Sequence, residues 1–341
     1  MITSDQKIGL FFLFLISFSI CQSQTILPKV ERVPLDSIHR IQKIAFGSAN
    51  HQSLPQEMWL NILDQKPNIW VSLGNMISGF SENTDELNEK YNKQLTKENY
   101  IRFLRKIPVI GIWDKNELGG EKNDTISIDR KISQQLFLDF IGEHLKSVRR
   151  EKDGIYTSYI FGEPDKRVRF IMLDTRYFRK KNAASELLGE TQWLWLEKTL
   201  EDTSAQLTFI CSGIPILSDN SKEENWNIYP NEISRFKKIL LNKKQMKIIL
   251  LSGNSGCNEI MSLNSNEQPL KIYEFSSGGL NHVQTKTGKN INSFAVANRN
   301  CLINSGLITI QWNKPTSVKI EFRDVQDFVI QEKTIFLEDV H

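Results

Sequence analysis

An apolar run that stops abruptly in a polar turn constrains this fold most, because the pattern repeats along the chain. The run 108–113 is followed at once by Asp114, Lys115, Asn116 and Glu117. Apolar runs of this length, bounded by turn residues, are typical of buried strands. In an open α/β sheet, ligands bind just beyond the carboxyl ends of the strands. The pattern therefore predicts a strand whose end faces a binding site.

The same succession of strand and polar turn occurs six more times. The further runs are 40–46, 68–73, 168–173, 207–211, 247–251 and 272–275, and each ends in a turn rich in glycine, serine, asparagine or aspartate. Strands that alternate with helical segments indicate an α/β fold. We therefore expect seven strand ends to direct polar turns at one common site.

The segments between these runs have the apolar spacing of helices. We predict helices over 56–65, 85–106, 129–144, 190–201 and 231–241. Beyond residue 300 the pattern changes to the alternation of strands, over 306–312, 315–323 and 328–335. This all-β part is expected to close or extend the sheet. The whole of 38–337 is predicted to be one α/β sandwich domain.

The N-terminus has the order of a secretory signal peptide. Lys7 precedes the apolar run 8–20, and polar residues follow at 22–24. The run is too short for a comfortable membrane span. We expect a signal peptide over 1–23 and a secreted or extracytoplasmic protein, with no membrane contact beyond the signal segment. An uncleaved anchor is the alternative.

Composition and cysteine spacing exclude several classes of protein. A net charge of +3, with 24% charged residues, gives no nucleic-acid signal. The cysteines lack the paired spacing of a zinc ribbon or a redox pair. Cys211 is expected to be buried, and whether Cys257 and Cys301 pair stays open. A glycosylation sequon begins at Asn123 and matters only in a eukaryotic source.

Read together, the strand-end turns resemble the PhoD-like (alkaline phosphatase D) branch of the metallophosphoesterases. The likeness runs from about Ile41 to Val329. It is carried by Gly-Ser-Ala-Asn (47–50), Leu-Gly-Asn-Met (73–76), Gly-Ile-Trp-Asp (111–114), Arg-Arg (149–150), Asp-Thr-Arg-Tyr-Phe-Arg (174–179), Leu-Gly-Glu-Thr-Gln-Trp (188–193), Trp226, Ser-Gly-Asn (252–254) and Ser-Ser-Gly-Gly-Leu-Asn-His (276–282). The resemblance implies an α/β/β/α sandwich and a metal-dependent phosphoric ester hydrolase with a di-metal centre, such as iron and calcium.

The departures from the family pattern fall on the residues that would hold those ions. Ala49 replaces a cysteine, Asn75 and Asn254 replace aspartates, and Gly256 replaces a histidine. Three further family residues are replaced by Met76, Ser78 and Glu117. Lys115 replaces another aspartate, and Asn116 replaces the histidine acid. Asp114 and the final histidine, His282, are kept.

These replacements oppose the chemistry of a two-metal site. Two ions activate a bound water and need anionic or imidazole ligands to offset their charge. Lys115 adds a cation where a carboxylate is required, and two like charges about 4 Å apart repel by roughly 4 kcal/mol at an effective dielectric constant of about 20. Asn116 cannot donate a proton to a leaving alkoxide. We predict a pseudoenzyme that holds no cofactor, or at most one residual divalent cation.

The alternative is an active phosphatase or phosphodiesterase with a rebuilt site. It would place Asp114, Glu117, His282 and His51 around one hard cation such as calcium. For His282 the other interpretation is a histidine hydrogen-bonded in a glycine-rich turn, and for His51 a surface position. A purely structural or adhesive module is a third hypothesis.

The remaining polar residues suggest a ligand site without catalysis. Asp114 and Glu117 flank Lys115, which indicates a local salt bridge that fills the old metal pocket. Asp174 and Arg176 either orient a phosphate or pin the loop as an ion pair. With Asp114, they are the predicted contacts to a phosphorylated ligand or a protein partner. The residues Trp193, Trp195 and Trp226 are expected to pack, and the role of Glu259 stays open.

Overall fold

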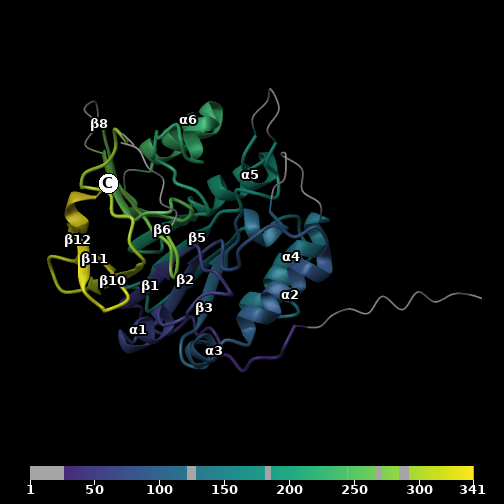
Figure 1. Cartoon of the computed structure of the whole chain (residues 1–341). Helices are drawn as coiled ribbons and strands as arrows, with labels where there is room; N and C mark the ends of the chain where they lie inside the picture. Colours follow the sequence, from purple (N-terminus) through teal and green to yellow (C-terminus); the bar gives the residue numbers. More distant parts are fainter. Residues whose placement is uncertain are drawn as a thin grey trace, which may run out of the picture.

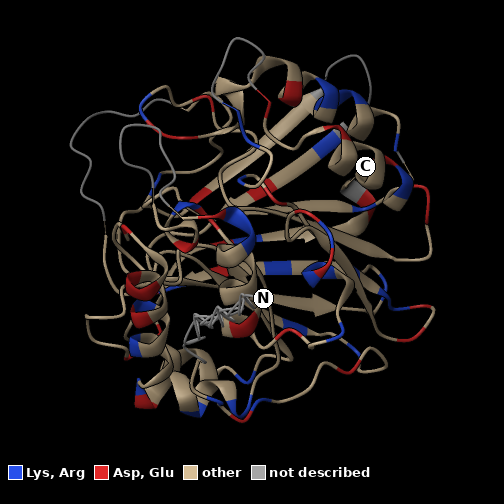
Figure 2. Cartoon of the chain, turned by 90° about the vertical axis from the view of Figure 1, so that its right-hand side faces the viewer, with Lys and Arg blue, Asp and Glu red and all other residues tan. Residues whose placement is uncertain are grey.

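The structure is a computed structural model that describes residues 27–120, 128–180, 186–243, 245–265, 270–283 and 292–340. The predicted signal peptide, its Cys21 and the sequon at Asn123 lie outside these ranges. No helix in the described ranges is long and apolar enough to cross a bilayer. Figure 2 shows acidic and basic residues interspersed along the loops and helices, so neither sign dominates that side.

Two six-stranded sheets form the centre of the molecule (Figure 1). The first sheet has the order β12 (Val329–Phe336), β11 (Ser317–Arg323), β10 (Ser305–Gln311), β1 (Lys43–Gly47), β2 (Ile69–Leu73) and β3 (Val109–Ile112). The second has the order β4 (Thr157–Phe161), β5 (Val168–Met172), β6 (Leu207–Ser212), β7 (Ile248–Ser252), β9 (Leu270–Ser276) and β8 (Glu259–Ser265). In the first sheet β1, β2 and β3 run parallel, and β10, β11 and β12 add antiparallel on the β1 side. In the second sheet β5, β6, β7 and β9 run parallel, and the edge strands β4 and β8 are antiparallel.

Alternation along the strands sorts the apolar side chains into two cores. In β5, Phe170 and Met172 belong to the core shared with the first sheet, whereas Ile171 belongs to the core under the outer helices. This two-residue period follows from the pleat of a strand, which sends successive side chains to opposite faces. Both faces of the second sheet are buried, which explains why its strands read as continuous apolar runs.

Helices cover the outer faces of the two sheets (Figure 1). The helices α5 (Glu190–Thr199) and α6 (Pro230–Leu241) lie over the second sheet and bury Trp193 and Phe236 in its core. On the first sheet lie α1 (Met58–Asp64), α2 (Thr84–Leu95), α3 (Glu98–Leu104) and α4 (Arg130–Ile141), with Trp59 of α1 packed on Trp70 of β2. The expected α/β/β/α sandwich is thereby confirmed.

The predicted helix 85–106 is wrong in one respect, because the structure divides it into α2 and α3. The α2 helix ends at Thr96, whose hydroxyl bonds the carbonyl of Lys93, and Lys97 is extended. The break turns α3 toward α1, where Tyr100 and Phe103 pack around Trp59. Packing on a third helix, which no local pattern records, decided this bend.

The strand β8 was not predicted, because its pairing with β9 and not its own composition makes it a strand. The C-terminal strands behave as expected. β10 pairs antiparallel with β1, and β11 and β12 follow outward, so this part extends the first sheet and does not close it.

Candidate functional site

The polar turns at the predicted strand ends meet at one corner between the sheets. The turn after β1 bonds the turn after β2, from the Ala49 N–H to the Gly74 carbonyl at 3.2 Å. Ser48 also pairs with Gly279 of the turn after β9. A Cβ at Gly253, after β7, would lie 2.3 Å from the carbonyl oxygen of Leu73, so only glycine fits this approach. The predicted convergence is confirmed.

Three of these turns hold a residue other than glycine in the left-handed region. The φ angles are 55° at Ala49, 54° at Asn75 and 56° at Asn254. Residues with a Cβ adopt this conformation at a cost of about 1–2 kcal/mol, and such strain collects at functional sites. All three positions are replaced ligand positions in the family pattern. The backbone therefore keeps a special shape at points where the ligand side chains have changed.

A closed ring of polar side chains fills the corner. Asn75 donates from its side-chain amide to Asp114 at 2.6 Å and to the Asn254 amide oxygen at 3.2 Å. Asp114 accepts from the Arg176 guanidinium, which also bonds both oxygens of Glu224 at 3.0 and 2.6 Å. The Asn254 amide closes the circle on Glu224 at 3.4 Å. We call these five residues the polar ring.

Charge compensation dominates the energetics of the polar ring. The Arg176 side chain is 1% exposed and Asp114 is fully buried, so neither charge is screened by water. Burial opposes ionisation of Glu224, but Arg176 and Arg179 outweigh it and lower the pKa of this carboxyl to about 2. Burial raises the pKa of Asp114, with Arg176 acting against that shift. The two carboxylates in turn raise the pKa of Arg176 and keep it charged.

Glu117 is not a member of the polar ring but binds the backbone of the turns that carry it. Its carboxylate accepts backbone N–H groups of Asn75 at 3.0 Å, Met76 at 2.5 Å and Asp114 at 2.9 Å. Burial raises the pKa of Glu117 to about 7, against these hydrogen bonds. A carboxylate that caps backbone groups in this way fixes the turns after β2 and β3. Three of the roughly four acceptor sites of this carboxylate are therefore occupied by backbone N–H groups.

The predicted salt bridge of Lys115 with Asp114 or Glu117 is wrong. Among the described residues the Lys115 side chain has no hydrogen bond or ion pair, because Asp114 pairs with Arg176 and Glu117 binds backbone. Lys115 is half-buried, and its charge acts against the rise in the pKa of Asp114 and adds to the lowering of the pKa of Glu224. The ammonium therefore lies near the ring with its donors unused.

Local contacts also hold Asn116 and Ser78, two other positions at which this chain departs from the family pattern. Asn116 donates its backbone N–H to the Asn75 side chain at 3.2 Å, which ties the first turn after β3 to the ring. Ser78 pairs through its backbone with the Gln52 side chain, at 2.8 and 3.0 Å. Gly256 takes a φ of 67°, and its missing side chain leaves the replaced histidine position without a donor.

Asp174 does not pair with the Arg176 side chain, so the expected Asp–Arg unit is wrong. The Asp174 carboxylate accepts the Trp113 indole N–H at 2.8 Å and the backbone N–H groups of Ile155, Arg176 and Tyr177 at 2.8–2.9 Å. It is fully buried, and its oxygens are committed to pinning these loops together. The predicted ligand contact at Asp174 is therefore not available.

The two histidines lie side by side at the rim of the corner. The rings of His51 and His282 are 5.8 Å apart and nearly perpendicular. His282 contacts the Asn281 side chain at 3.3 Å, and Asn281 also receives the backbone N–H of His51 at 2.8 Å. Burial lowers the pKa of both histidines, so both are mainly neutral at pH 7. The structure brings the two rings together, and the Asn281 side chain links the turns that carry them.

The donor set of this corner does not fit a di-metal centre. No group of three or more histidine, cysteine, aspartate or glutamate side chains gathers within metal-binding reach in the ranges that the structure describes. Asn75 turns an N–H donor toward Asp114, and Arg176 occupies the other side of that carboxylate. A cation here would face a guanidinium, an ammonium and an amide N–H, which it repels.

One member of the ring, Glu224, and its ion-pair partner Arg179 were not identified as site residues in the sequence analysis. Glu224 lies in the loop before Trp226, away from any strand end, and nothing in its local sequence indicates a role. Arg179 was noted only as part of a matching segment, and it forms an ion pair with Glu224. Of the other positions, Trp193 and Trp226 are buried as expected, while Trp195 is half-buried against Tyr156. Glu259 is buried on β8, and burial raises its pKa.

Comparison with known proteins gives one family and one fold. A family model described as PhoD-like phosphatase matches residues 75–323. A solved structure titled "Structure of PhoD" superposes with a TM-score of 0.70 at 15% identity, covering 89% of this chain and 70% of that one. A zinc complex of Vps29 from Entamoeba histolytica reaches a TM-score of only 0.32 at 8% identity, over 86% of this chain and 99% of that one. No curated protein matches the chain.

Proposed function

Because the chain belongs to the PhoD-like phosphatase family, we propose that it is a secreted member that no longer hydrolyses phosphoric esters. The polar ring carries this proposal. A guanidinium lies between Asp114 and Glu224, and Asn75 and Asn254 bridge the gap between the two carboxylates. In this arrangement the positive charge that stabilises Asp114 comes from the protein itself.

The proposed loss of hydrolysis follows from the side chains that are present at the positions of the acid and the ligands. A metal-assisted hydrolase needs ligands to hold the ion and an acid to protonate the leaving group. The acid position is Asn116, which lacks an ionisable proton, and its backbone is tied to Asn75. The Glu117 carboxylate accepts hydrogen bonds from three backbone N–H groups. The residues of the rebuilt-site alternative are thus committed elsewhere, apart from the histidine pair.

The direct test combines metal analysis with an aryl-phosphate assay on purified protein. We expect no stoichiometric metal after exposure to iron, calcium or zinc, and no turnover above buffer. A Lys115→Ala variant is the matched control. Turnover that is equal in both proteins and insensitive to chelator comes from a contaminant and agrees with the proposal. Stoichiometric metal together with turnover that a chelator abolishes would overturn it.

We also propose that this corner binds an anionic group of a phosphorylated ligand. Lys115 supports this, because its ammonium is half-buried beside the ring and has unused donors. A lysine in this state gains little from the ring, whose carboxylates are already paired, and attracts an incoming anion as a point charge. The histidines at the rim would add neutral hydrogen-bonding groups.

Binding of inorganic phosphate, followed by amide chemical shifts, tests this second proposal. We expect saturable shifts in the residues 114–117, and at least a tenfold weaker affinity in Lys115→Ala. Lys146→Ala, which removes an exposed lysine elsewhere, is the control and should bind as the native chain does. Equal affinity in all three proteins would show that Lys115 takes no part.

Secretion is proposed from the N-terminal sequence and from the cysteines. The order of charges and apolar residues in 1–23 is that of a signal peptide. Cys257 and Cys301 are joined by a disulfide, and disulfides persist mainly in oxidising compartments. Sequencing the N-terminus of protein recovered from the producing organism tests this. A first residue near 22–24 is expected, and an intact Met1 would contradict a cleaved signal.

A further inference from the structure

The disulfide between Cys257 and Cys301 is linked by two routes to the segments that carry Asn254 and Glu224 of the polar ring. The first connection is the turn after β7. Asn254 of the ring is followed by Ser255, whose hydroxyl bonds the Cys257 carbonyl and, at 3.2 Å, the Ser277 carbonyl. Only two residues therefore separate Asn254 of the ring from Cys257.

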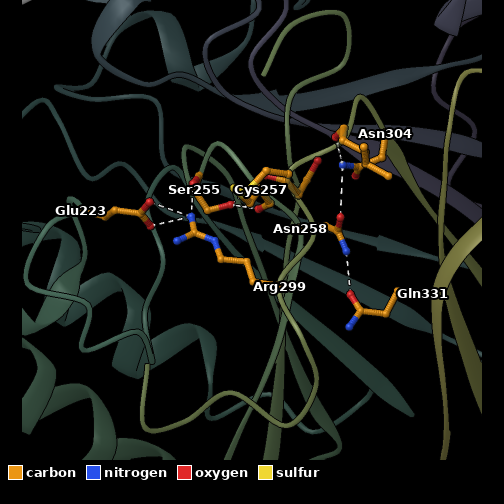
Figure 3. The surroundings of a disulfide bond; sticks show 10 residues. Glu223, Ser255, Cys257, Asn258, Arg299, Asn304 and Gln331 are labelled. Atoms are coloured by element: carbon orange, nitrogen blue, oxygen red, sulfur yellow. Dashed lines mark hydrogen bonds and ion pairs between the residues drawn. A yellow bond between two sulfur atoms is a disulfide. The ribbon is translucent and has the colours of Figure 1, made fainter. Parts of the chain in front are cut away.

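The second connection runs through Arg299, two residues before Cys301. Its guanidinium bonds both oxygens of Glu223 at 2.7 and 2.8 Å and also the Ser255 carbonyl. Glu223 is 7% exposed and directly precedes Glu224 of the ring. Figure 3 shows Arg299 reaching across to Glu223 from the side of the disulfide. The bond thus lies at the junction of the two arms that carry Asn254 and Glu224.

Amide contacts align the two cysteine segments beside the bond. The backbones of Asn258 and Asn300 exchange hydrogen bonds at 2.8 and 3.2 Å. The Asn258 side chain donates to Gln331 at 2.6 Å and accepts from Asn304 at 3.4 Å (Figure 3). These neutral contacts fix where the segments cross. They do not reach the ring, so they hold the disulfide in place without closing the corner themselves.

The arm that carries Asn254 needs such a constraint. Its φ of 56° is strained, and its two ring bonds are long, at 3.2 and 3.4 Å. The longer of the two, to Glu224, exceeds the usual range of N–H···O hydrogen bonds and is weak. A covalent link restricts the loop far more strongly, because it removes alternative conformations of the segment. The geometry near Asn254 is therefore maintained mainly by the disulfide and its neighbours.

We propose that the Cys257–Cys301 disulfide is a redox-sensitive latch that keeps the polar ring closed. A soluble dithiol supplies two electrons and two protons. Its thiolate attacks the disulfide, the second thiol resolves the mixed disulfide, and two cysteine thiols and one cyclic disulfide result. Cys301 is exposed whereas Cys257 is buried, so the reductant approaches from the Cys301 side. Release of both arms opens the side of the ring formed by Asn254 and Glu224.

Hydrogen exchange of the full chain, resolved by mass spectrometry, tests the latch. Reduction with dithiothreitol should raise exchange rates at least tenfold in 220–226 and 252–258, while α1 and the strands β10–β12 stay unchanged. The double variant Cys257→Ser/Cys301→Ser should show the same pattern without reductant, and dithiothreitol should then have no effect on it.

A second variant separates the two arms. Arg299→Met leaves the disulfide intact but cuts the link to Glu223, so exchange should rise in 220–226 and less in 252–258. Faster exchange confined to the residues beside the cysteines, or spread equally over both sheets, would overturn the latch. The latch rests on the geometry of the ring and not on the proposed loss of hydrolysis. Exchange rates do not depend on catalysis, so the two proposals fail separately.

Discussion

Two arginines, each 1% exposed, lie in two regions of this molecule, and different kinds of partner compensate their buried charges. Arg149, after α4, bonds the carbonyls of Ile155 and Gly111 at 2.8 and 3.0 Å, as well as Glu143 and Tyr159. Arg176, in the strand-end corner, bonds the carboxylates of two separate loops. One arginine binds chiefly to neutral backbone, and the other is balanced by charge.

This difference in partners separates a structural region from a region whose stability depends on charge. Hydrogen bonds from Arg149 to the backbone join β3 and the turn before β4, and this arrangement is purely structural. Around Arg176, the buried Asp114 and the partly buried Glu224 carboxylates would repel each other without a cation between them. Such a corner is suited to hold positive charge, and here a side chain provides it. The strand-end corner should therefore respond strongly to changes of charge, and the Arg149 region should not.

Removing Arg176 should have the largest effect. Arg176→Met leaves Asp114 buried without its ion-pair partner and leaves Glu224 with Arg179 alone, which should lower the free energy of unfolding by about 3–5 kcal/mol. Urea unfolding at pH 7 measures this. Adding Asp114→Asn to this variant should recover part of the loss, because it removes the fully buried charge. A loss below about 1 kcal/mol in the single variant would contradict the expectation that the strand-end corner depends strongly on its charges.

Acid should weaken the corner next. The pKa of Glu224 is about 2 in the folded protein and about 4.5 in the unfolded chain. The stabilisation is therefore present above pH 4.5 and is lost as the pH falls toward 2, to the order of 3 kcal/mol. Urea unfolding at several pH values, compared with Glu224→Gln, measures this share. If the variant shows the same acid dependence as the native chain, Glu224 is not its source.

Arg149→Met should destabilise the fold by about 2 kcal/mol, less than Arg176→Met. It leaves buried carbonyls unpaired, but its carboxylate partner Glu143 keeps contact with solvent. Because the lost partners are mainly neutral, adding Glu143→Gln should recover little. Unfolding curves of the single and double variants test this. A recovery as large as that expected for Asp114→Asn in the other region would remove the distinction between them.

The smallest expected effect is a gain in stability. Ala49→Gly relieves the left-handed strain at φ 55° and should raise the free energy of unfolding by about 0.5–1 kcal/mol. Ala45→Gly, in the middle of β1, is the matched control and should lower it instead. Thermal unfolding of both variants provides the measurement. A loss of stability in Ala49→Gly would show that the alanine methyl contributes packing that outweighs the strain.

The strand-end corner was predictable from sequence where position along the chain decides the outcome. Apolar runs that end in polar turns located Asp114, Asn75 and Asn254 correctly, because parallel strands bring their carboxyl ends to one edge. The partners of those residues were not predictable. Glu224 comes from a long loop, and Arg176 was assigned to its sequence neighbour Asp174, which instead accepts the Trp113 indole and backbone N–H groups.

By itself, the sequence determined the sandwich, its C-terminal extension and the residue types at the strand ends, because periodicity and residue identity are local properties. Only the tertiary structure decided which residues compensate the charges in the strand-end corner. Ion pairs depend on which loops approach within about 4 Å, and that distance is set by the packing of two sheets. The pairing of Arg176 with Asp114 and Glu224, and the disulfide beside them, are results of that packing.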